Sequence, residues 1–549
     1  MKSKIIDRVV RAHFLKNLST KLRLYIVLAV IVMISLVGGA IAIYSTASGP
    51  WGYSDSVAYI STARSVLQGK GLGYYEGNTD FEYMSHLPAF YSLVLSAIGI
   101  TGINLVVAVR WFDVVAFVIS IFAAGWIFYR YSRAKVLGII ASALMCAFPG
   151  MVSMFSSAFS EPLFILLLLL SGFFLLAYLR TENLLRLFFA AVIVGFMPVT
   201  RYVGLALPLC GALTVLLFAS GPWQRRLKSA AVFTLVAYLP TLCWFIWSYF
   251  ASGHSIGELS LGINLETLVA RFKTFNGLFI VIIHKWWPIY TNFRYRTRIF
   301  ILAAMAIAIA MLSLLAYRRM RKAGEGDSKA DLAVFAFFGL AAFAHLAVLM
   351  ISYLFTSPTP DVNDRTLLPL YVGSVMSLLG ALALWQAAWF RGRRRWLQVV
   401  PWLMAALCLY WYLPQARQTA AGYHLGDGLT AYHWNSSQTI QGVRTLPQGM
   451  PVISNDWELL MLWTDRPVRG LWNTFPVTSP VQIVRYGTKT TDVAQSIFCK
   501  QGAALVIFED FPAQYREKVG EAYLPQLPAL FEGLTVRGKY SDGTIYLCP

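Results

Sequence analysis

Residues 49–75 read "GPWGYSDSVAYISTARSVLQGKGLGYY" and follow an apolar run that extends from Leu24 to Tyr44. About 20 apolar residues cross the hydrocarbon core of a bilayer as a helix, so this run predicts a membrane span. It is too long for the core of a signal peptide and lacks a small-residue cleavage site, so we expect it to be retained. The quoted stretch then opens the first loop outside the membrane. It predicts a helix that Ser54 or Asp55 can cap.

The composition predicts a polytopic α-helical membrane protein. The 549 residues are 57% hydrophobic and 13% charged, with a mean hydropathy of +0.59. A soluble domain carries about twice that charged fraction. We predict eleven spans, the fifth short or tilted because "GFMPVTRY" interrupts it: 24–45, 104–129, 135–152, 162–180, 187–200, 203–220, 229–250, 298–317, 332–355, 367–390 and 396–413.

The placement of basic residues predicts the orientation. The net charge is +20, yet residues 414–549 are neutral, with 11 Lys+Arg and 11 Asp+Glu. Most of the excess lies in six short segments at alternate ends of the apolar runs: 1–23, 130–135, 180–186, 221–228, 318–331 and 391–395. Cytoplasmic loops of membrane proteins carry this excess, whereas a nucleic-acid-binding protein gathers it in one patch. We therefore expect a bacterial inner or plasma membrane protein with a cytoplasmic N-terminus, and no nucleic-acid partner.

The apolar runs and the basic segments between them predict two domains. Residues 1–413 form the membrane domain, with long external loops at 46–103 and 251–297, and residues 414–549 lie outside. The apolar stretch "HLPAFYSLVLSAIGI" (86–100) is expected to lie on or dip into the outer face, and "FNGLFIVIIHKWWPIY" to resemble it. After residue 413, short strands such as "MPVISND", "ALVIF" and "GTIYLC" alternate with helices, which predicts a small α/β domain. The sequence does not decide whether Cys499 and Cys548 form a disulfide.

Polar residues from separate external loops collect at one level of the membrane domain. Charge near hydrocarbon is costly unless it is paired, hydrated or functional, so carboxylates and guanidiniums from several loops indicate a site for an anion at the membrane surface. The main members are Asp55, Asp80, Glu82, His86, Glu161, Arg201, Arg294, Arg296 and Arg365.

Several motifs resemble the GT-C glycosyltransferases, multi-span enzymes that use polyprenyl-phosphate sugars and include the protein mannosyltransferase and aminoarabinose transferase groups. "YSDSVAYISTARSVLQGKGLGYY" resembles their first-loop pattern of an aspartate, a tyrosine (here Tyr59) and "A..L..G.G..Y". "HLPAFYSLVLSAI", "SEPLF", "TRYVGL" and "NDRTLLPLY" are similar to further segments of the family. The resemblance covers about residues 24–375. It implies transfer of a sugar, with inversion, from a polyprenyl-phosphate carrier to a lipid, glycan or protein acceptor at the outer face.

The resemblance also implies roles for individual residues. Asp55 would be the base that accepts the proton of the acceptor hydroxyl, the alternative being a simple helix cap. Arg365 and Arg201 would hold the donor phosphate, followed by Arg294 and Arg296. A local pair of Arg365 with Asp361 or Asp364 is the alternative. Contacts to the donor or acceptor sugar are expected from Tyr59, Glu161, His86, Asp80 and Glu82, although Glu161 also suits the N-terminus of a helix.

Metal dependence and two rival functions stay open. His254 and Glu258 have i,i+4 spacing, which places two ligands on one helix face, so a divalent ion is one option and no other cofactor is indicated. A transporter or flippase would place its polar groups at the bilayer midplane on repeated halves, and neither feature is seen in the sequence. An O-antigen-ligase-like assembly protein would also use an undecaprenyl-linked donor and external arginines.

Overall fold

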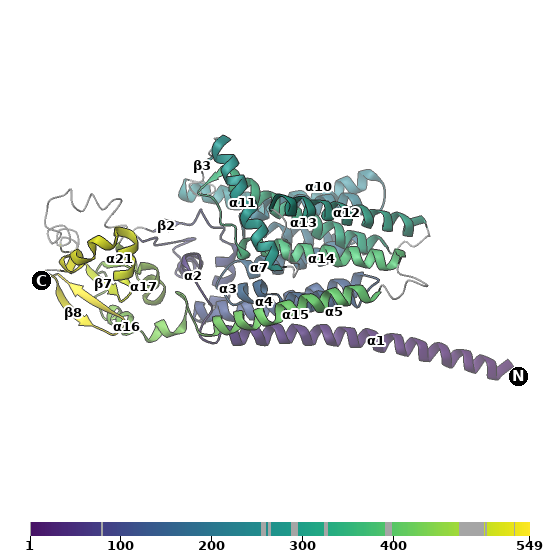
Figure 1. Cartoon of the computed structure of the whole chain (residues 1–549), viewed down its shortest axis with the longest axis horizontal. Coiled ribbons are helices and arrows are strands. Elements are labelled where there is room, and N and C mark those ends of the chain that lie inside the picture. The colour runs from purple at the N-terminus through teal and green to yellow at the C-terminus, as the bar shows by residue number, and fades with distance from the viewer. Residues whose placement is uncertain are drawn as a thin grey trace.

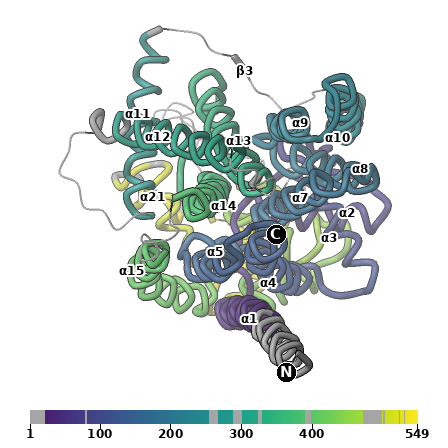
Figure 2. Tube along the Cα trace, turned by 90° about the vertical axis from the view of Figure 1, so that its right-hand side faces the viewer, coloured from purple at the N-terminus to yellow at the C-terminus, as the bar shows by residue number. Residues whose placement is uncertain are grey.

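The computed structural model describes residues 2–77, 81–253, 260–261, 265–286, 295–322, 328–389, 398–471, 499, 502–531 and 533–548. An elongated helical bundle carries a small α/β domain at one end, and the N-terminus of α1 lies at the other (Figure 1). We call the end with the α/β domain the domain end and the opposite end the far end. Seen along its length, the bundle has α1 at its edge and α4, α5, α7 and α14 towards its centre (Figure 2).

Every segment predicted to span the membrane contains helix. The bundle consists of α1 Lys2–Ser45, α4 Leu105–Tyr131, α5 Leu137–Ala147, α6 Pro149–Met154, α7 Glu161–Thr181, α8 Leu184–Gly195, α9 Leu207–Phe218, α10 Trp223–Ser252, α11 Leu265–Trp286, α12 Tyr295–Lys322, α13 Ser328–Phe355, α14 Asp364–Trp389 and α15 Val400–His424. As expected, the fifth segment is short: α8 has 12 residues.

The predicted number of eleven spans is not confirmed. Within the described residues, eight helices are long and apolar enough to cross a membrane: α1, α4, α7, α10, α11, α12, α13 and α14. The apolar helices α5 and α8 are shorter than these. We expected the apolar stretch that becomes α11 to lie at the outer face, but this helix is long enough to span.

The first loop folds against the domain end of the bundle. It contains α2 (Ser54–Leu67), a hairpin of β1 (Gly73–Tyr74) and β2 (Glu82–Tyr83), and α3 (Phe90–Gly99). Tyr53 occupies the N-cap position of α2, and its backbone N–H donates to Ser56 Oγ at 3.1 Å. Asp55 therefore lies in the first turn of the helix without capping it, and its carboxylate is available for other contacts.

The C-terminal domain is built on a five-stranded mixed sheet with the order β6-β5-β7-β9-β8. The parallel strands are β5 Val452–Ser454, β6 Val468–Gly470 and β7 Ala504–Phe508, and the antiparallel strands are β8 Thr535–Lys539 and β9 Gly543–Leu547. Three helices pack around it: α16 Gln438–Arg444, α17 Trp457–Thr464 and α21 Phe511–Val519. A disulfide joins Cys499 to Cys548 and links the approach to β7 with the end of β9.

A short extended segment around Trp51 joins the bundle to the α/β domain. On one side, the Trp51 N–H donates to the carbonyl of Ser156 at 2.9 Å, and the Trp51 carbonyl accepts from the Ala158 N–H at 2.7 Å. On the other side, the Leu429 N–H donates to the Gly52 carbonyl at 3.0 Å. Gly428 has a φ of +94°, and a Cβ on it would lie 2.7 Å from the Gly52 carbonyl oxygen, so this close approach requires glycine.

Two carboxylates lie side by side at the carboxyl ends of β5 and β7. The side-chain amide of Gln514 donates to Asp456 at 3.0 Å and to Asp510 at 2.7 Å, and the Asn455 amide donates to Asp510 at 3.1 Å. Burial raises the pKa of Asp456 from 3.8 to about 7, and the neighbouring Asp510 charge adds to the rise. A carboxyl group whose folded-state pKa is raised binds more protons in the folded than in the unfolded protein.

The stability of this sheet is therefore expected to fall as the pH rises from about 4 to about 7. In the intact protein, hydrogen exchange at the amides of β5 and β7, corrected for the intrinsic rate, measures this as a smaller free energy of opening at pH 7.5 than at pH 5. Asp456→Asn should remove most of the dependence. A free energy of opening that increases with pH would contradict the expectation.

Candidate active site

Four charged side chains from separate segments meet at the domain end of the bundle. We call this set the charged cluster: Asp55 of α2, Glu161 of α7, Arg201 before the short 3-10 helix Tyr202–Ala206, and Arg365 of α14. Arg365 Nη2 donates to Asp55 Oδ2 at 2.7 Å, and Arg365 Nε donates to Glu161 Oε1. Arg201 Nη1 lies 2.6 Å from the same Glu161 oxygen. The cluster thus balances two carboxylates against two guanidiniums.

Glu161 is the centre of the charged cluster. Its side chain has no exposed surface, whereas Arg201 and Arg365 are 17% and 21% exposed and Asp55 is 35% exposed. As the first residue of α7, followed by Pro162, Glu161 lies where a helix favours both a carboxylate and a proline. Among the described residues, its Oε2 has no hydrogen-bond partner. The helix position and the two arginines together hold a charge that burial alone would disfavour.

The neighbours of the charged cluster fix its arginines. The Arg365 guanidinium lies 3.8 Å from the centre of the Phe159 ring, in a cation–π contact. Arg201 Nη1 also donates to Ser160 Oγ at 3.2 Å, and the Tyr59 hydroxyl lies 3.2 Å from the same Ser160 oxygen. Burial, with a smaller contribution from the Asp55 carboxylate, raises the pKa of Tyr59 to about 12, so its hydroxyl stays protonated near neutral pH.

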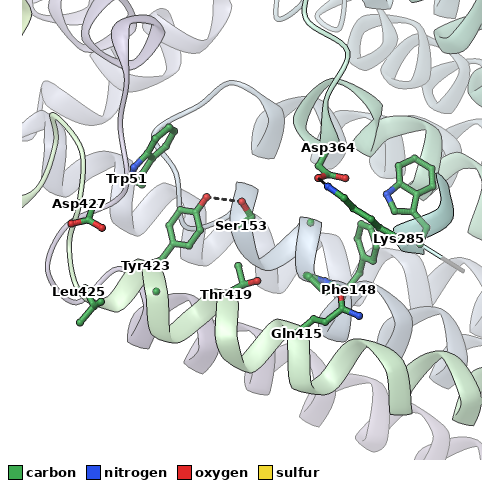
Figure 3. A pocket seen from close by; sticks show the side chains of 14 residues that line it. Trp51, Phe148, Ser153, Lys285, Asp364, Gln415, Thr419, Tyr423, Leu425 and Asp427 are labelled. Carbon is green, nitrogen blue, oxygen red and sulfur yellow. Dashed lines mark hydrogen bonds and ion pairs between the residues drawn. The ribbon is translucent and has the colours of Figure 1, made fainter. Parts of the chain in front are cut away.

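A cavity of about 540 Å³ lies beside the charged cluster, between α15 and the starts of α6 and α14. Tyr423 and Ser153 form a 2.6 Å hydrogen bond across its wall, and Lys285 pairs with Asp364 at 3.1 Å (Figure 3). Gln415 and Thr419 of α15 also point into it (Figure 3). Trp51, on its rim, contacts the Phe159 ring that supports Arg365. Phe159 thus contacts both Trp51 of the cavity lining and Arg365 of the charged cluster.

The structure brings four of the predicted site residues together, places Glu82 and His86 in the first loop, and does not describe the side chains of Asp80, Arg294 and Arg296. Asp55, Glu161, Arg201 and Arg365 form the charged cluster, and Tyr59 reaches it through Ser160. Glu82 lies in β2 and His86 follows it, and both side chains are exposed. Asp80, Arg294, and the His254 and Glu258 pair lie outside the described residues, and Arg296 lies in α12 with its side chain outside them. The roles assigned to these residues stay predictions.

Sequence reasoning missed the supporting residues. Phe159 and Ser160 precede Glu161 in "FSEPLF", and only their position next to a buried carboxylate suggests a role. Glu458 of α17 brings a carboxylate from the α/β domain close to Ser54 at the start of α2. Burial raises the pKa of Glu458, and the charges of Glu76 and Asp55 contribute further. No local pattern links residue 458 with residue 54, so the sequence carries no signal for this contact.

One oxygen of each carboxylate in the charged cluster is engaged by Arg365: Asp55 Oδ2 and Glu161 Oε1. Across the part of the chain that the structure describes, no group of three or more His, Cys, Asp or Glu side chains is close enough to hold a metal ion.

Solved structures with the same fold come from two kinds of membrane enzyme. The chain is similar to the oligosaccharyltransferase of Archaeoglobus fulgidus in its complex with zinc and sulfate, with a TM-score of 0.52 and 13% identity over 93% of this chain and 72% of that one. It is also similar to ArnT from Cupriavidus metallidurans, apo and bound to undecaprenyl phosphate, with a TM-score of 0.50 and 14% identity over 94% and 97% of the two chains. Comparison of the sequence with protein-family profiles and with curated proteins finds no match.

These similarities establish the fold. The chain is an integral membrane protein with the GT-C fold that the sequence motifs predicted, and a β-containing C-terminal domain is present as expected. At 13–14% identity, the likeness extends to the arrangement of helices and not to a substrate.

Replacing Glu161 by glutamine is expected to destabilise the protein by about 3 kcal/mol, because it leaves two partly buried guanidiniums without their shared carboxylate. Glu182→Gln is the matched control. Glu182 pairs with Arg225, whose side chain is 58% exposed, so its loss should cost less than about 1 kcal/mol. Thermal unfolding of the two purified variants measures the difference. Equal melting temperatures would show that the Glu161 charge does not stabilise the fold.

Proposed function

We propose that the chain is a glycosyltransferase that moves a sugar from a polyprenyl-phosphate carrier to an acceptor hydroxyl at the domain end of the bundle. The observation that carries this proposal is the charged cluster, in which Arg365 is shared between Asp55 and the buried Glu161. It lies on a fold that this chain shares with ArnT, which has been solved with undecaprenyl phosphate. From the basic segments we infer that the N-terminus is cytoplasmic and that the α/β domain lies outside.

Arg365 is the residue that links donor binding to catalysis. Its Nε bonds to Glu161, which fixes the guanidinium, while its Nη2 bonds to the more exposed Asp55. A donor phosphate that takes the place of Asp55 at Nη2 frees the Asp55 carboxylate without releasing Arg365 from Glu161. Arg201, held by Glu161 and Ser160, adds a second positive charge. Guanidiniums placed in advance stabilise the negative charge that grows on the leaving phosphate.

The transfer is then a single displacement. The acceptor oxygen forms a bond to the anomeric carbon of the sugar, and the bond from that carbon to the phosphate oxygen breaks. Asp55 takes the proton of the acceptor hydroxyl, and polyprenyl phosphate leaves with the electron pair. A single displacement inverts the configuration at the anomeric carbon.

The neighbouring cavity suits the hydroxyl-rich part of a substrate. At about 540 Å³ it falls within the range of small-molecule sites. Its walls present hydroxyl, amide and charged groups from Ser153, Thr419, Gln415 and Lys285, together with the rings of Trp51 and Trp286. Rings and hydrogen-bonding side chains in one cavity favour a sugar over an acyl chain. We assign the acceptor, or the sugar of the donor, to this cavity. The polyprenyl tail would lie along the helix surfaces nearby.

Asp55→Asn should lower transfer by about a hundredfold or more, because the amide cannot accept the acceptor proton. The test is transfer from a panel of labelled polyprenyl-phosphate sugars to a membrane extract. Asp361→Asn is the control, since Asp361 is an exposed carboxylate four residues before Arg365. Equal transfer by wild type and Asp55→Asn would refute the role of the base. If wild type transfers from no donor in the panel, the proposed donor class is wrong.

Arg365→Lys should weaken both donor binding and turnover, by about tenfold or more in kcat/KM. An ammonium group cannot keep the Glu161 contact and hold a phosphate by parallel hydrogen bonds. The comparison is Arg417→Lys on the exposed face of α15, which should retain wild-type kinetics. If Arg365→Lys binds the donor as wild type does, the phosphate is held elsewhere.

A further inference from the structure

The helix α17 of the α/β domain packs against α2, the helix that carries Asp55. At the start of both helices, Glu458 lies close to Ser54. At the end of both helices, Arg64 of α2 reaches the last turn of α17. The two helices therefore run side by side in the same direction, and the domain contacts α2 near both of its ends.

The guanidinium of Arg64 binds the C-terminus of α17. Its Nη2 donates to the Leu462 carbonyl at 2.9 Å, and its Nη1 donates to the Met461 carbonyl at 3.4 Å. Nη1 also lies 3.4 Å from Oδ1 of Asp465, the C-cap residue of α17. The last carbonyls of a helix carry a partial negative charge, so a cation from α2 is favoured at this position.

The contact between Arg64 and α17 is largely withdrawn from water. The Arg64 side chain is 21% exposed, and burial lowers its pKa, which the charge of Asp465 opposes. The side-chain amide of Gln68, one turn further along the chain, donates to Oδ2 of Asp465 at 2.9 Å. Because a guanidinium is planar and holds its donors in fixed directions, the acceptors around Arg64 fix the rotation of α2 against α17.

Arg64 and Asp55 lie on opposite faces of α2. Asp55 is nine residues before Arg64, which turns its side chain by about 180° around the helix axis. One face of α2 thus meets α17 through Arg64, and the other presents Asp55 to Arg365 of α14 at 2.7 Å. A rotation of α2 that broke the contacts of Arg64 would therefore also carry Asp55 away from its partner on α14.

We propose that Arg64 is a positioning residue, which uses the C-terminus of α17 to hold α2 in the rotation that directs Asp55 at the acceptor hydroxyl. The α/β domain then completes the active site, because it supports the helix of the base. Arg64 acts through Asp55, so its role rests on the proposed function. The donor phosphate would not depend on this support, since Arg201 and Arg365 are held by Glu161 of α7.

The test is transfer by the full-length Arg64→Gln variant, with the labelled polyprenyl-phosphate sugars as donors. We expect kcat to fall about tenfold or more, because a displaced base is poorly aligned with its proton. The KM for the donor should stay within about twofold of wild type, because the phosphate-binding arginines are untouched. Arg64→Lys keeps the charge and should recover part of the loss. This variant also serves if Arg64→Gln fails to fold, and a kcat equal to wild type would then contradict the proposal.

The matched control is Arg444→Gln. Arg444 donates to the Trp463 carbonyl at 2.7 Å and thus binds the same end of α17, but it belongs to α16 of the α/β domain and not to α2. Its loss weakens the end of α17 without releasing α2, so this variant should keep wild-type kinetics. Equal losses of kcat in Arg444→Gln and Arg64→Gln would show that only the stability of α17 matters.

A double-mutant cycle separates positioning from a general loss of structure. In the Asp55→Asn background, Arg64→Gln should change the residual transfer by less than about twofold, because the group that it positions is already gone. A tenfold fall in both backgrounds would overturn the proposal. Hydrogen exchange at the amides of α2 needs no substrate, and Arg64→Gln should speed it up about tenfold. Unchanged exchange would contradict the role of Arg64 alone. If wild type transfers from no donor, the proposed function fails, and the exchange still decides whether Arg64 holds α2.

Discussion

A single buried carboxylate organises the domain end of this protein. Glu161 lies at the start of α7 without exposed surface and accepts from Arg201 and Arg365, which come from segments 40 and 204 residues further along the chain. Removing a carboxylate from water is costly unless opposite charges accompany it. Three separate segments must therefore converge before that cost is offset. The first loop joins these segments because Arg365 donates a second hydrogen bond, through Nη2, and Asp55 accepts it.

The sequence predicted the residues of the charged cluster better than their pairing. The alternative to phosphate binding paired Arg365 with Asp361 or Asp364 nearby, yet Arg365 contacts Asp55 and Glu161, while Asp364 pairs with Lys285. Adjacent residues on a helix point about 100° apart, so Asp364 and Arg365 face different neighbours. Which neighbour each one meets depends on the rotation of α14 in the bundle. Apolar runs predict that a helix exists, but they do not fix its rotation against distant segments.

Contacts with distant segments also explain which strands of the α/β domain the sequence did not predict. The strands β5, β7 and β9 were predictable because "VIS", "ALVIF" and "GTIYL" are apolar or β-branched. The edge strands β6 and β8 were not: "VRG" of β6 has a single apolar side chain, and "TVRGK" of β8 is mostly exposed. Edge strands gain their structure from a neighbour and not from their own side chains. The disulfide between Cys499 and Cys548, left open by the sequence, likewise depends on strand order, which places the two ends together.

The helix α15 continues without interruption from the bundle to His424, through Pro414, and the α/β domain begins shortly after it. Its residues Gln415, Thr419 and Tyr423 recur at every fourth position along one wall of the cavity beside the charged cluster. Because positions four apart on a helix lie on nearly the same face, these three side chains reach the cavity only in this register of the helix. Inserting or deleting one residue before Gln415 would turn that wall by about 100° and carry the attached sheet around with it. Length changes in related chains should therefore be absent from this helix and confined to the segments that flank it.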